Sequence, residues 1–312
     1  MIVQGIKKIV ISGNSFLRDF GIGLQILPIL KKYNNDLEIV WLGSEEQKII
    51  ADLTSFIDSF EIISDSFLFN DVNALLLLSE NNELSKQARD QKIQYRVGGK
   101  YSWRYNRRLT HSIDLSKSTT LLDAYFQIIS LLEIPSKDCF TSTDIINAPD
   151  QFFRGVFKKE EKNFLFYPYR EEEHRAWPGI RYFELIEALP KYVNNYIVAG
   201  NEMEGKALKL TSPELFRSPS VKDYTEIEDL EEALALISKA DQFITYNNDM
   251  AHFAYAMGVN VLIISAAADT FYLHNDLNKV VTNDASCIKC IGDKACECMK
   301  KLQINTVLEE VS

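Results

Sequence analysis

Ile244-Thr245-Tyr246-Asn247-Asn248-Asp249-Met250-Ala251-His252-Phe253-Ala254-Tyr255-Ala256-Met257-Gly258 is the stretch of sequence that decides the fold. An apolar run enters it from Gln242, and the polar residues 247–249 then break that run. The segment that follows has a helical pattern and stops at Gly258, since glycine commonly ends helices. Residues 259–264 form a second apolar run. We therefore predict strand, polar turn, helix and strand, with the turn at the carboxyl end of a strand, where doubly wound sheets bind ligands.

The polar turn at 247–249 has two interpretations. The helix that starts there directs free N–H groups and the positive end of its dipole toward the turn, an arrangement that suits a phosphate. Alternatively, Asn248 or Asp249 only caps the helix by accepting a hydrogen bond from one of those N–H groups. The spacing leaves both interpretations open.

Length and composition indicate a soluble protein of two domains. The chain has 312 residues, enough for two domains of ordinary size, and its 25% of charged residues is typical of soluble globular proteins. The formal net charge of −10 argues against general affinity for nucleic acid. No apolar run reaches the roughly 18 residues of a membrane span, and the N-terminus enters a strand directly instead of forming a signal peptide. Because the five cysteines are an odd number, we expect a reducing, cytoplasmic setting.

Strands and helices alternate along both halves of the chain. In the first half, a strand at 8–12, a loop at 13–21, a helix at 22–33 and a strand at 37–42 form a crossover unit. The other expected elements are strands at 74–78, 93–97, 163–167 and 196–199, and helices at 83–90, 119–132, 182–189 and 230–237. The segment at 136–159 separates the halves, so we predict two Rossmann-like α/β domains, residues 1–157 and 158–312.

One local cluster of positive charge lies in this acidic chain. Basic residues are interleaved with aromatic ones between 96 and 108, and they are Arg96, Lys100, Arg104, Arg107 and Arg108. Such a cluster suits a phosphorylated or acidic acceptor; the alternative is an ordinary solvated loop.

Polar residues in the second half gather where predicted strands end. Arg175 and Trp177 follow the strand at 163–167, and Glu204 follows the strand at 196–199. A guanidinium suits a pyrophosphate because its donors are planar and permanently charged, and a carboxylate suits a sugar diol. We therefore expect these polar residues to lie together on the loops at the carboxyl ends of the strands in the second half.

Together these segments resemble glycosyltransferase family 9, the lipopolysaccharide heptosyltransferases, over nearly the whole chain. The resemblance is carried by Arg175-Ala176-Trp177-Pro178, by the turn from Gly200 to Glu204, and by Asn247 to His252 with the small residues and Gly258 that follow. It implies the GT-B fold, two Rossmann-like doubly wound domains facing across a cleft, with the acceptor on residues 1–157 and the nucleotide sugar on residues 158–312. It also implies a final helix, near 305–311, that packs back toward the first domain.

The resemblance assigns candidate residues to both substrates. The nucleotide-sugar site comprises Arg175, Trp177, Glu204, Asn247, Asn248, Asp249 and His252. The acceptor site comprises Arg96, Lys100, Arg104 and Arg107. Asp249 stands where the family has glycine, so we expect its carboxylate to compete with the phosphate for the helix N–H groups.

The general base is the main departure from the family pattern. The family has Gly-Asp at the start of its first helix, six residues before a proline, and counting back from Pro28 puts Ile22 at that aspartate. Isoleucine accepts no proton. Asp19 is the one acidic residue between 13 and 23, so we predict that it is the catalytic base.

The function implied is inverting transfer of a sugar, such as a heptose, from a nucleotide diphosphate donor to a bacterial glycan or glycolipid. This reaction requires no cofactor, and the expected location is cytoplasmic, with peripheral contact with the inner membrane. A degenerate member that binds a nucleotide sugar or a protein partner without catalysis is the main alternative, supported by Ile22 and Asp249. Another GT-B enzyme, such as a sugar-nucleotide epimerase, is the third interpretation, and it needs several acid/base carboxylates.

Four cysteines near the C-terminus have the spacing of a thiolate metal site. They are Cys287, Cys290, Cys296 and Cys298. Four thiolates suit a structural zinc or iron ion. Similar cysteines recur in the family that the chain resembles, and related bacterial heptosyltransferases hold iron. Four reduced thiols without an ion are the alternative.

Overall fold

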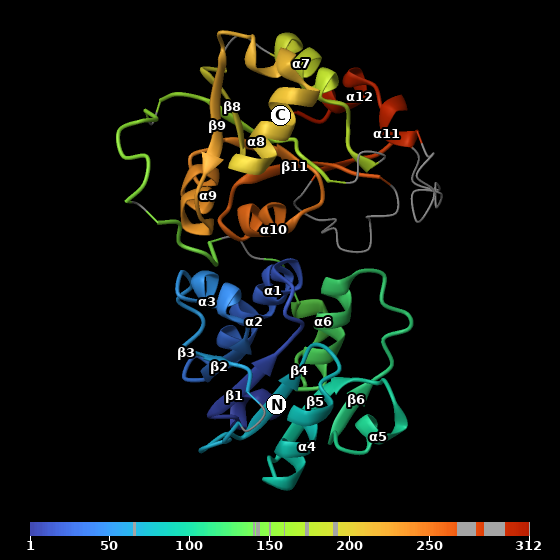
Figure 1. Cartoon of the computed structure of the whole chain (residues 1–312). Helices are drawn as coiled ribbons and strands as arrows, with labels where there is room; N and C mark the ends of the chain where they lie inside the picture. The colour runs from blue at the N-terminus through green and yellow to red at the C-terminus, as the bar shows by residue number, and fades with distance from the viewer. Residues whose placement is uncertain are drawn as a thin grey trace. The chain divides into compact units, whose positions relative to one another are not determined.

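The computed structural model describes the chain apart from residues 65–66, 140, 142–143, 150, 159, 172–174, 190–192, 267–278, 284–296 and 312. The chain divides into two compact units, Met1–Asn147 and Ala148–Ser312 (Figure 1). This division falls inside the 136–159 segment that the sequence assigns to the junction, before the predicted boundary at residue 157. In the part of the chain that is described, no helix is long and apolar enough to cross a membrane.

The first unit is built on a six-stranded parallel sheet with the strand order β3-β2-β1-β4-β5-β6. Its strands are β1 (Lys8–Ser12), β2 (Glu38–Gly43), β3 (Ser59–Ile62), β4 (Ala74–Leu77), β5 (Tyr95–Gly99) and β6 (His111–Ile113). Its helices are α1 (Leu17–Gly23), α2 (Leu27–Tyr33), α3 (Glu45–Ala51), α4 (Asn82–Asp90), α5 (Trp103–Asn106) and α6 (Leu121–Ser130), with the 3-10 turns η1 (Ile2–Gly5), η2 (Leu24–Ile26) and η3 (Ser136–Asp138). This strand order is that of the doubly wound dinucleotide-binding folds.

The second unit repeats this topology. Its parallel sheet has the order β12-β11-β10-β7-β8-β9. If β7 is counted as the first strand and the sheet is read from β9, this is the strand order of the first sheet. The strands are β7 (Asn163–Tyr167), β8 (Asn195–Asn201), β9 (Val221–Ile227), β10 (Gln242–Thr245), β11 (Asn260–Ile264) and β12 (Lys279–Val281). The helices are α7 (Gly179–Ala188), α8 (Glu202–Thr211), α9 (Leu230–Ile237), α10 (Asp249–Ala256), α11 (Cys298–Lys301) and α12 (Ile304–Leu308), with the 3-10 turn η5 (Pro213–Phe216).

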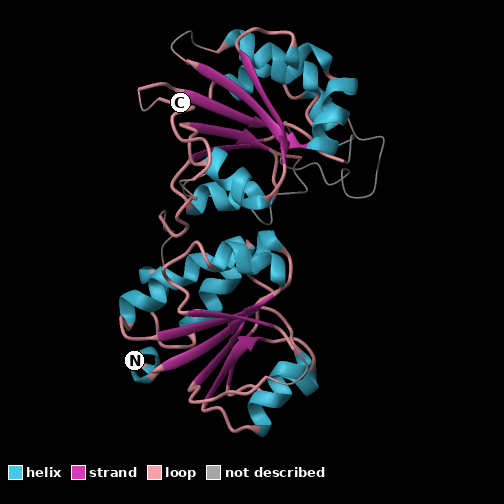
Figure 2. Ribbon diagram, turned by 60° about the vertical axis from the view of Figure 1, so that its left-hand side comes forward, coloured by secondary structure: helices cyan, strands magenta, loops and turns pink. Residues whose placement is uncertain are grey.

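Helices cover both faces of each sheet (Figure 2). Successive strand residues point to opposite faces, so Phe164 and Phe166 of β7 pack against α7 and α12, whereas Leu165 packs against α9 and α10. A strand that is buried on both faces must be apolar throughout. For this reason the short hydrophobic runs of the sequence located the central strands of both sheets.

The first helix begins earlier than the sequence pattern predicts. Residues 13–21 were expected to form a loop, but α1 starts at Leu17, and Asp19 therefore lies in its first turn. Gly23 weakens the helical signal of the sequence, and its position is crowded, since a Cβ atom would lie 3.0 Å from the ring of Trp41. The helical spacing predicted over 22–33 corresponds to the end of α1, the turn η2 and α2.

The stretch from residue 244 to residue 258 has the predicted structure. Strand β10 is followed by the polar turn and α10, and Gly258 adopts a φ of 79°, a left-handed conformation that favours glycine after a helix. The last helix, α12, packs on α7, and Val307 belongs to the core of the second unit. The packing of this helix toward the first unit stays a prediction.

Candidate functional site

Each sheet has one point where the strand order changes direction, and doubly wound folds bind ligands at the carboxyl ends of the strands there. In the first sheet this point lies between β1 and β4, and in the second between β7 and β10. Asp19 follows β1, and the turn Asn247–Asp249 follows β10. The topology therefore places predicted site residues at the switch point of each unit.

Hydrogen bonds tie together the carboxyl ends of three neighbouring strands in the second unit. Tyr167 ends β7, and its hydroxyl donates to Oε2 of Glu204 in α8 over 2.6 Å. The same oxygen accepts from the backbone N–H of Asn201, the last residue of β8, over 2.8 Å. Thr245 ends β10, and its hydroxyl donates to the carbonyl oxygen of Tyr167 over 3.1 Å. These contacts fix the relative positions of the three strand ends.

Tyr246 and Arg170 extend this arrangement into what we call the carboxyl-edge cluster (Tyr167, Arg170, Glu204 and Tyr246). The guanidinium carbon of Arg170 lies 5.1 Å from the centroid of the Tyr246 ring. Burial, and then the charge of Glu204, raise the pKa of Tyr246 to about 12, and the same causes raise the pKa of Tyr167. Both hydroxyls are therefore protonated at neutral pH. The cluster thus combines a guanidinium, a carboxylate and phenolic hydroxyls, groups that bind phosphates and sugar hydroxyls.

The sequence analysis assigned no role to Tyr167 or Tyr246. The available signal was their position, because each stands at the end of an apolar run where a parallel strand stops. Glu204 lies where it was predicted, but its Oε2 already closes the capping box of α8 with Asn201. Its first role is therefore to fix the start of α8.

Asn248 caps α10. Its Oδ1 accepts a hydrogen bond from the N–H of Ala251 over 2.9 Å, and its Nδ2 donates to the hydroxyl of Thr245 over 3.0 Å. Of the two residues considered for the cap, Asn248 is therefore the one used, and Asp249 is the partly exposed first residue of the helix. The Asp249 charge lies at the N-terminus of α10, and its competition with a phosphate stays a prediction.

Asn247 and His252 are buried beneath this turn. Oδ1 of Asn247 lies 3.2 Å from Nε2 of His252, and both side chains are almost completely buried. A ligand outside the turn therefore does not meet the His252 ring. We assign this pair to holding the turn in place, which differs from the direct ligand contact that the resemblance implied.

Trp177 is a core residue. Its side chain is 3% exposed, its indole N–H donates to the carbonyl oxygen of Leu302 over 3.0 Å, and its ring meets the ring of Tyr182 edge-on. This burial gives Trp177 a role in the core, and its contact with the nucleotide sugar stays a prediction. Arg175, two residues earlier in the segment that joins β7 to α7, is partly buried and stays a candidate for the phosphate.

In the first unit, Asp19 is held by neighbours on the loop after β1. It is 5% exposed, and its Oδ2 accepts a hydrogen bond from Nδ2 of Asn14 over 2.7 Å. Nε of Arg18 lies 3.8 Å from its Oδ1. The buried Gln47 donates to the carbonyl oxygen of Asn14 over 2.8 Å and so anchors the loop. The structure thus provides an oriented carboxylate at the start of the first helix.

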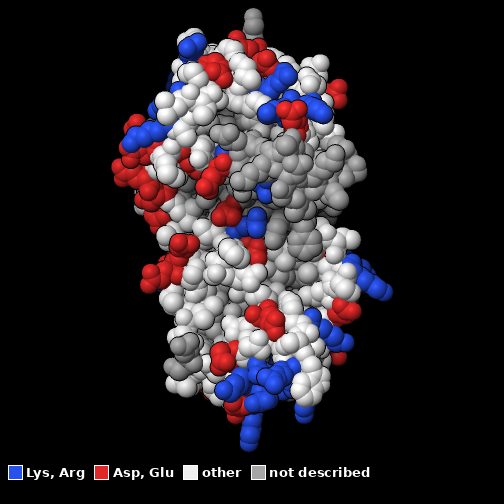
Figure 3. All heavy atoms as spheres, turned by 45° about the vertical axis from the view of Figure 1, so that its right-hand side comes forward, with Lys and Arg blue, Asp and Glu red and all other residues white. Residues whose placement is uncertain are grey.

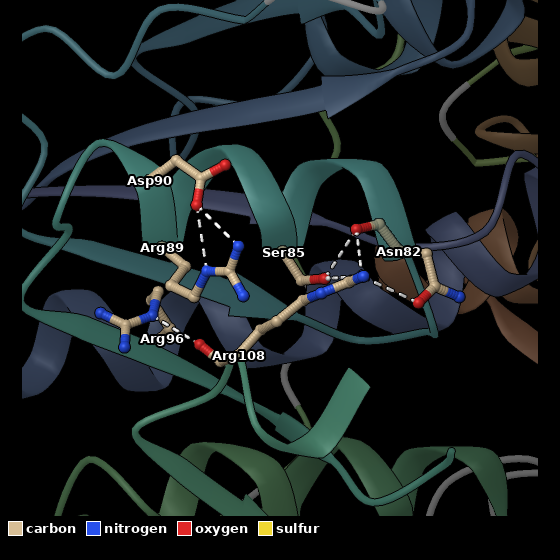
Figure 4. A network of polar contacts seen from close by, with 6 residues as sticks. All are labelled: Asn82, Ser85, Arg89, Asp90, Arg96 and Arg108. Carbon is tan, nitrogen blue, oxygen red and sulfur yellow. Dashed lines mark hydrogen bonds and ion pairs between the residues drawn. The ribbon is translucent and has the colours of Figure 1, made fainter. Parts of the chain in front are cut away.

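Arg96 has a structural role. It lies near the amino end of β5, and its guanidinium donates to the backbone carbonyl oxygens of Arg108, over 2.6 Å, and of Ile93 (Figure 4). Desolvation, and then the nearby charge of Arg89, lower its pKa. Ligands of this fold bind at the opposite, carboxyl end of the strands, and the acceptor contact of Arg96 stays a prediction.

The other predicted acceptor residues are solvent-exposed. Lys100 follows the carboxyl end of β5, Arg104 lies in α5, and Arg107 follows α5. The guanidinium of Arg107 lies 4.8 Å from the centroid of the Trp103 ring. These three side chains are available to a ligand, and their acceptor contact stays a prediction.

The predicted metal site lies largely outside the described residues, since they do not include Cys287, Cys290 or Cys296. Cys298 begins α11 and is buried in the core of the second unit. Where the structure is described, it contains no group of three or more side chains that would hold a metal ion. The zinc or iron site therefore stays a prediction.

The sequence profile of glycosyltransferase family 9 (heptosyltransferase) matches residues 87–301, which is more than half of the chain. The chain belongs to this family. A comparison with curated protein sequences found no match. Family 9 membership supports a role in glycosyl transfer, as the sequence analysis predicted.

Solved structures of the family share the fold. The chain is similar to the family 9 glycosyltransferase of Veillonella parvula, with a TM-score of 0.74, 16% identity, and coverage of 97% of this chain and 94% of that chain. The ADP-heptose lipopolysaccharide heptosyltransferase II of E. coli gives a TM-score of 0.72, 14% identity and 97% coverage of both chains. E. coli heptosyltransferase WaaC with ADP-2-deoxy-2-fluoro heptose gives a TM-score of 0.68, 11% identity, and coverage of 97% of this chain and 98% of that chain. Both units therefore have the Rossmann-like architecture of GT-B proteins, which confirms the predicted fold class.

Proposed function

We propose that this family 9 member is an active, inverting glycosyltransferase that moves a sugar from a nucleotide diphosphate to a glycan or glycolipid acceptor. A heptose is the sugar we favour, because one similar structure holds a fluorinated ADP-heptose. The second unit binds the donor, with Arg175 and the turn before α10 near the diphosphate, and the first unit binds the acceptor.

The reaction proposed is a direct displacement. The oxygen of an acceptor hydroxyl attacks the anomeric carbon, and the bond from that carbon to the diphosphate oxygen breaks. The diphosphate leaves with the electron pair, and Asp19 takes the proton of the attacking hydroxyl. Positive charge from Arg175 and from the N-terminus of α10 stabilises the leaving group.

The position of Asp19 in the first turn of α1 carries this proposal. The family pattern has an aspartate at the start of its first helix, and counting back from Pro28 had put Ile22 there. In this chain α1 begins at Leu17, so Asp19 lies in the first turn of the first helix, although Ile22 occupies the counted position. An acid at the start of the first helix supports an active enzyme over a degenerate member.

The test is Asp19→Asn, assayed for donor binding by calorimetry and for sugar transfer by product analysis. We expect turnover to fall roughly 10²–10⁴-fold with nearly unchanged donor affinity, since the base acts only on the acceptor. Asp52→Asn is the matched control, because Asp52 is exposed and pairs with Lys48 on the surface. Wild-type turnover in Asp19→Asn would move the base elsewhere.

Asp249 is the observation that favours the alternative, binding without catalysis. Its negative charge lies at the N-terminus of α10, where it opposes a phosphate. A wild-type protein that binds donors and transfers to none of the acceptors offered would support that alternative.

A further inference from the structure

Helix α8 carries an apolar stripe that the folded chain leaves exposed. Met203 and Leu210 are 71% and 84% exposed, and Ala207 between them is partly exposed. These three residues have the spacing i, i+4 and i+7, so they lie on one side of the helix. Gly205 and Leu208 of the same helix are buried, on the side that packs against β9. The stripe is therefore on the side opposite the core and faces water.

A neighbouring residue extends this stripe. Ile180 is exposed at the start of α7, and it lies beside the end of α8, because a Cβ atom on Gly179 would touch the side chain of Ser212. Single exposed apolar residues are common on protein surfaces. An apolar stripe along one face of a helix is instead typical of a helix that packs against another helix.

The order of side chains in the stripe is self-complementary. A large residue stands near each end, Met203 and Leu210, and the small Ala207 lies near the middle. In an antiparallel pair about a two-fold axis near Ala207, Met203 of one copy meets Leu210 of the other. The two alanines meet at the axis, and their small size lets the helices approach closely.

The charges beside the stripe favour the same arrangement. Glu202, Lys206 and Lys209 have the same spacing as the stripe and flank it on one side. A two-fold axis sets this flank beside its own copy in the reverse direction, so Glu202 of each copy approaches Lys209 of the other. In a parallel pair Glu202 would meet Glu202 instead. Within each copy, Glu202 pairs with Lys206 and Lys209 pairs with Asp223, which orients these side chains.

The surface of the second unit carries charge of both signs. Figure 3 shows basic atoms gathered at the end of the first unit where Figure 1 places α4 and α5, whereas basic and acidic atoms are mixed on the second unit. A surface of mixed sign repels a second copy less than a surface of one sign does.

We propose that α8 pairs with α8 of a second copy of the chain, antiparallel and about a two-fold axis, to form a dimer. A second copy supplies both the matching stripe and the reversed charges, which any other partner would have to match separately. Because a helix of 10 residues is about 15 Å long, the interface is small, and the association should be reversible and concentration-dependent. The pairing does not depend on the proposed transfer reaction.

Sedimentation equilibrium of the full-length protein tests the pairing without any substrate. Between about 1 μM and about 200 μM, the average mass should rise from that of the monomer toward that of the dimer. Leu210→Ala should raise the dissociation constant about 30-fold, since each dimer loses two leucine contacts. Leu68→Ala is the matched control, because Leu68 is an exposed leucine of the first unit, and it should leave the constant unchanged. A monomer at every concentration, an unchanged constant in Leu210→Ala, or equal weakening by both variants would overturn the proposal.

Charge-reversal variants test the antiparallel arrangement. Glu202→Lys and Lys209→Glu should each weaken self-association about tenfold at low salt, because both approaches across the axis then join like charges. Mixed in equal amounts, the two variants should associate with each other more tightly than either does with itself, since the mixed pair restores opposite charges. Added salt should remove these differences. Single variants that associate like the wild type, or a mixture that associates no more tightly than they do, would rule out this arrangement.

Discussion

Replacing Trp177 with phenylalanine decides between a role in the fold and a role in the ligand site. The indole N–H satisfies the carbonyl oxygen of Leu302, and both residues are buried. Phenylalanine leaves that carbonyl without its donor, which lowers the free energy of unfolding by about 1–3 kcal/mol. The void beside the smaller ring lowers it by about 1 kcal/mol more. We therefore expect the free energy of unfolding to fall by about 2–4 kcal/mol, with nucleotide-sugar affinity unchanged under native conditions.

The assay is urea unfolding followed by far-UV circular dichroism, since removing a tryptophan alters the fluorescence signal itself. Trp103→Phe is the matched control: its ring is exposed, so the free energy of unfolding should change by about 1 kcal/mol or less. Calorimetry with the nucleotide sugar measures the second readout. Wild-type stability together with weakened nucleotide-sugar affinity would refute the structural role and restore the ligand contact that the sequence predicted.

Three further predictions concern the second unit. Arg175→Ala should weaken nucleotide-sugar binding by about 1.5–3 kcal/mol, the range for a charged hydrogen bond; unchanged affinity in a folded variant would rule out the proposed diphosphate position. Asp249→Gly should tighten donor binding because it removes a negative charge at the N-terminus of α10 while Asn248 keeps the cap; weaker binding would mean that Asp249 contacts the ligand itself. Metal analysis of protein purified under reducing conditions should find one zinc or iron ion per chain if the four cysteines form the predicted site, and clearly less than about one equivalent would favour thiols without an ion.

The sequence predicted the central strands and several helices well because these elements are buried on both sides or along one face. The expected strand at 163–167 and helix at 230–237 coincide with β7 and α9. Two of the strands that it missed lie at sheet edges: β3 is mostly exposed, and β6 has three half-buried residues. Short edge strands carry no apolar run, so hydrophobic patterning does not reveal them.

The candidate site was harder to predict than the fold, because residue type does not say which hydrogen bonds a side chain makes. The sequence located the polar turn before α10, but it did not decide between Asn248 and Asp249 as the cap. It placed Trp177 with the ligand because the resemblance to the family rests on residues 175–178, and such a resemblance does not say whether a side chain is buried. The sequence pattern put Asp19 in a loop because Gly21 and Gly23 weaken the helical signal, whereas it lies in the first turn of α1.

The repeated strand order of the two units has a consequence for how this protein can diverge. Each unit has its own parallel sheet and its own switch point, and the first is complete by residue 147. Asn14 and Asp19 lie in the first unit, and Tyr167 and Glu204 lie in the second. If the two units bind different substrates, as we propose, specificity for one substrate can change while the half for the other is conserved, so relatives with a common donor and different acceptors are expected.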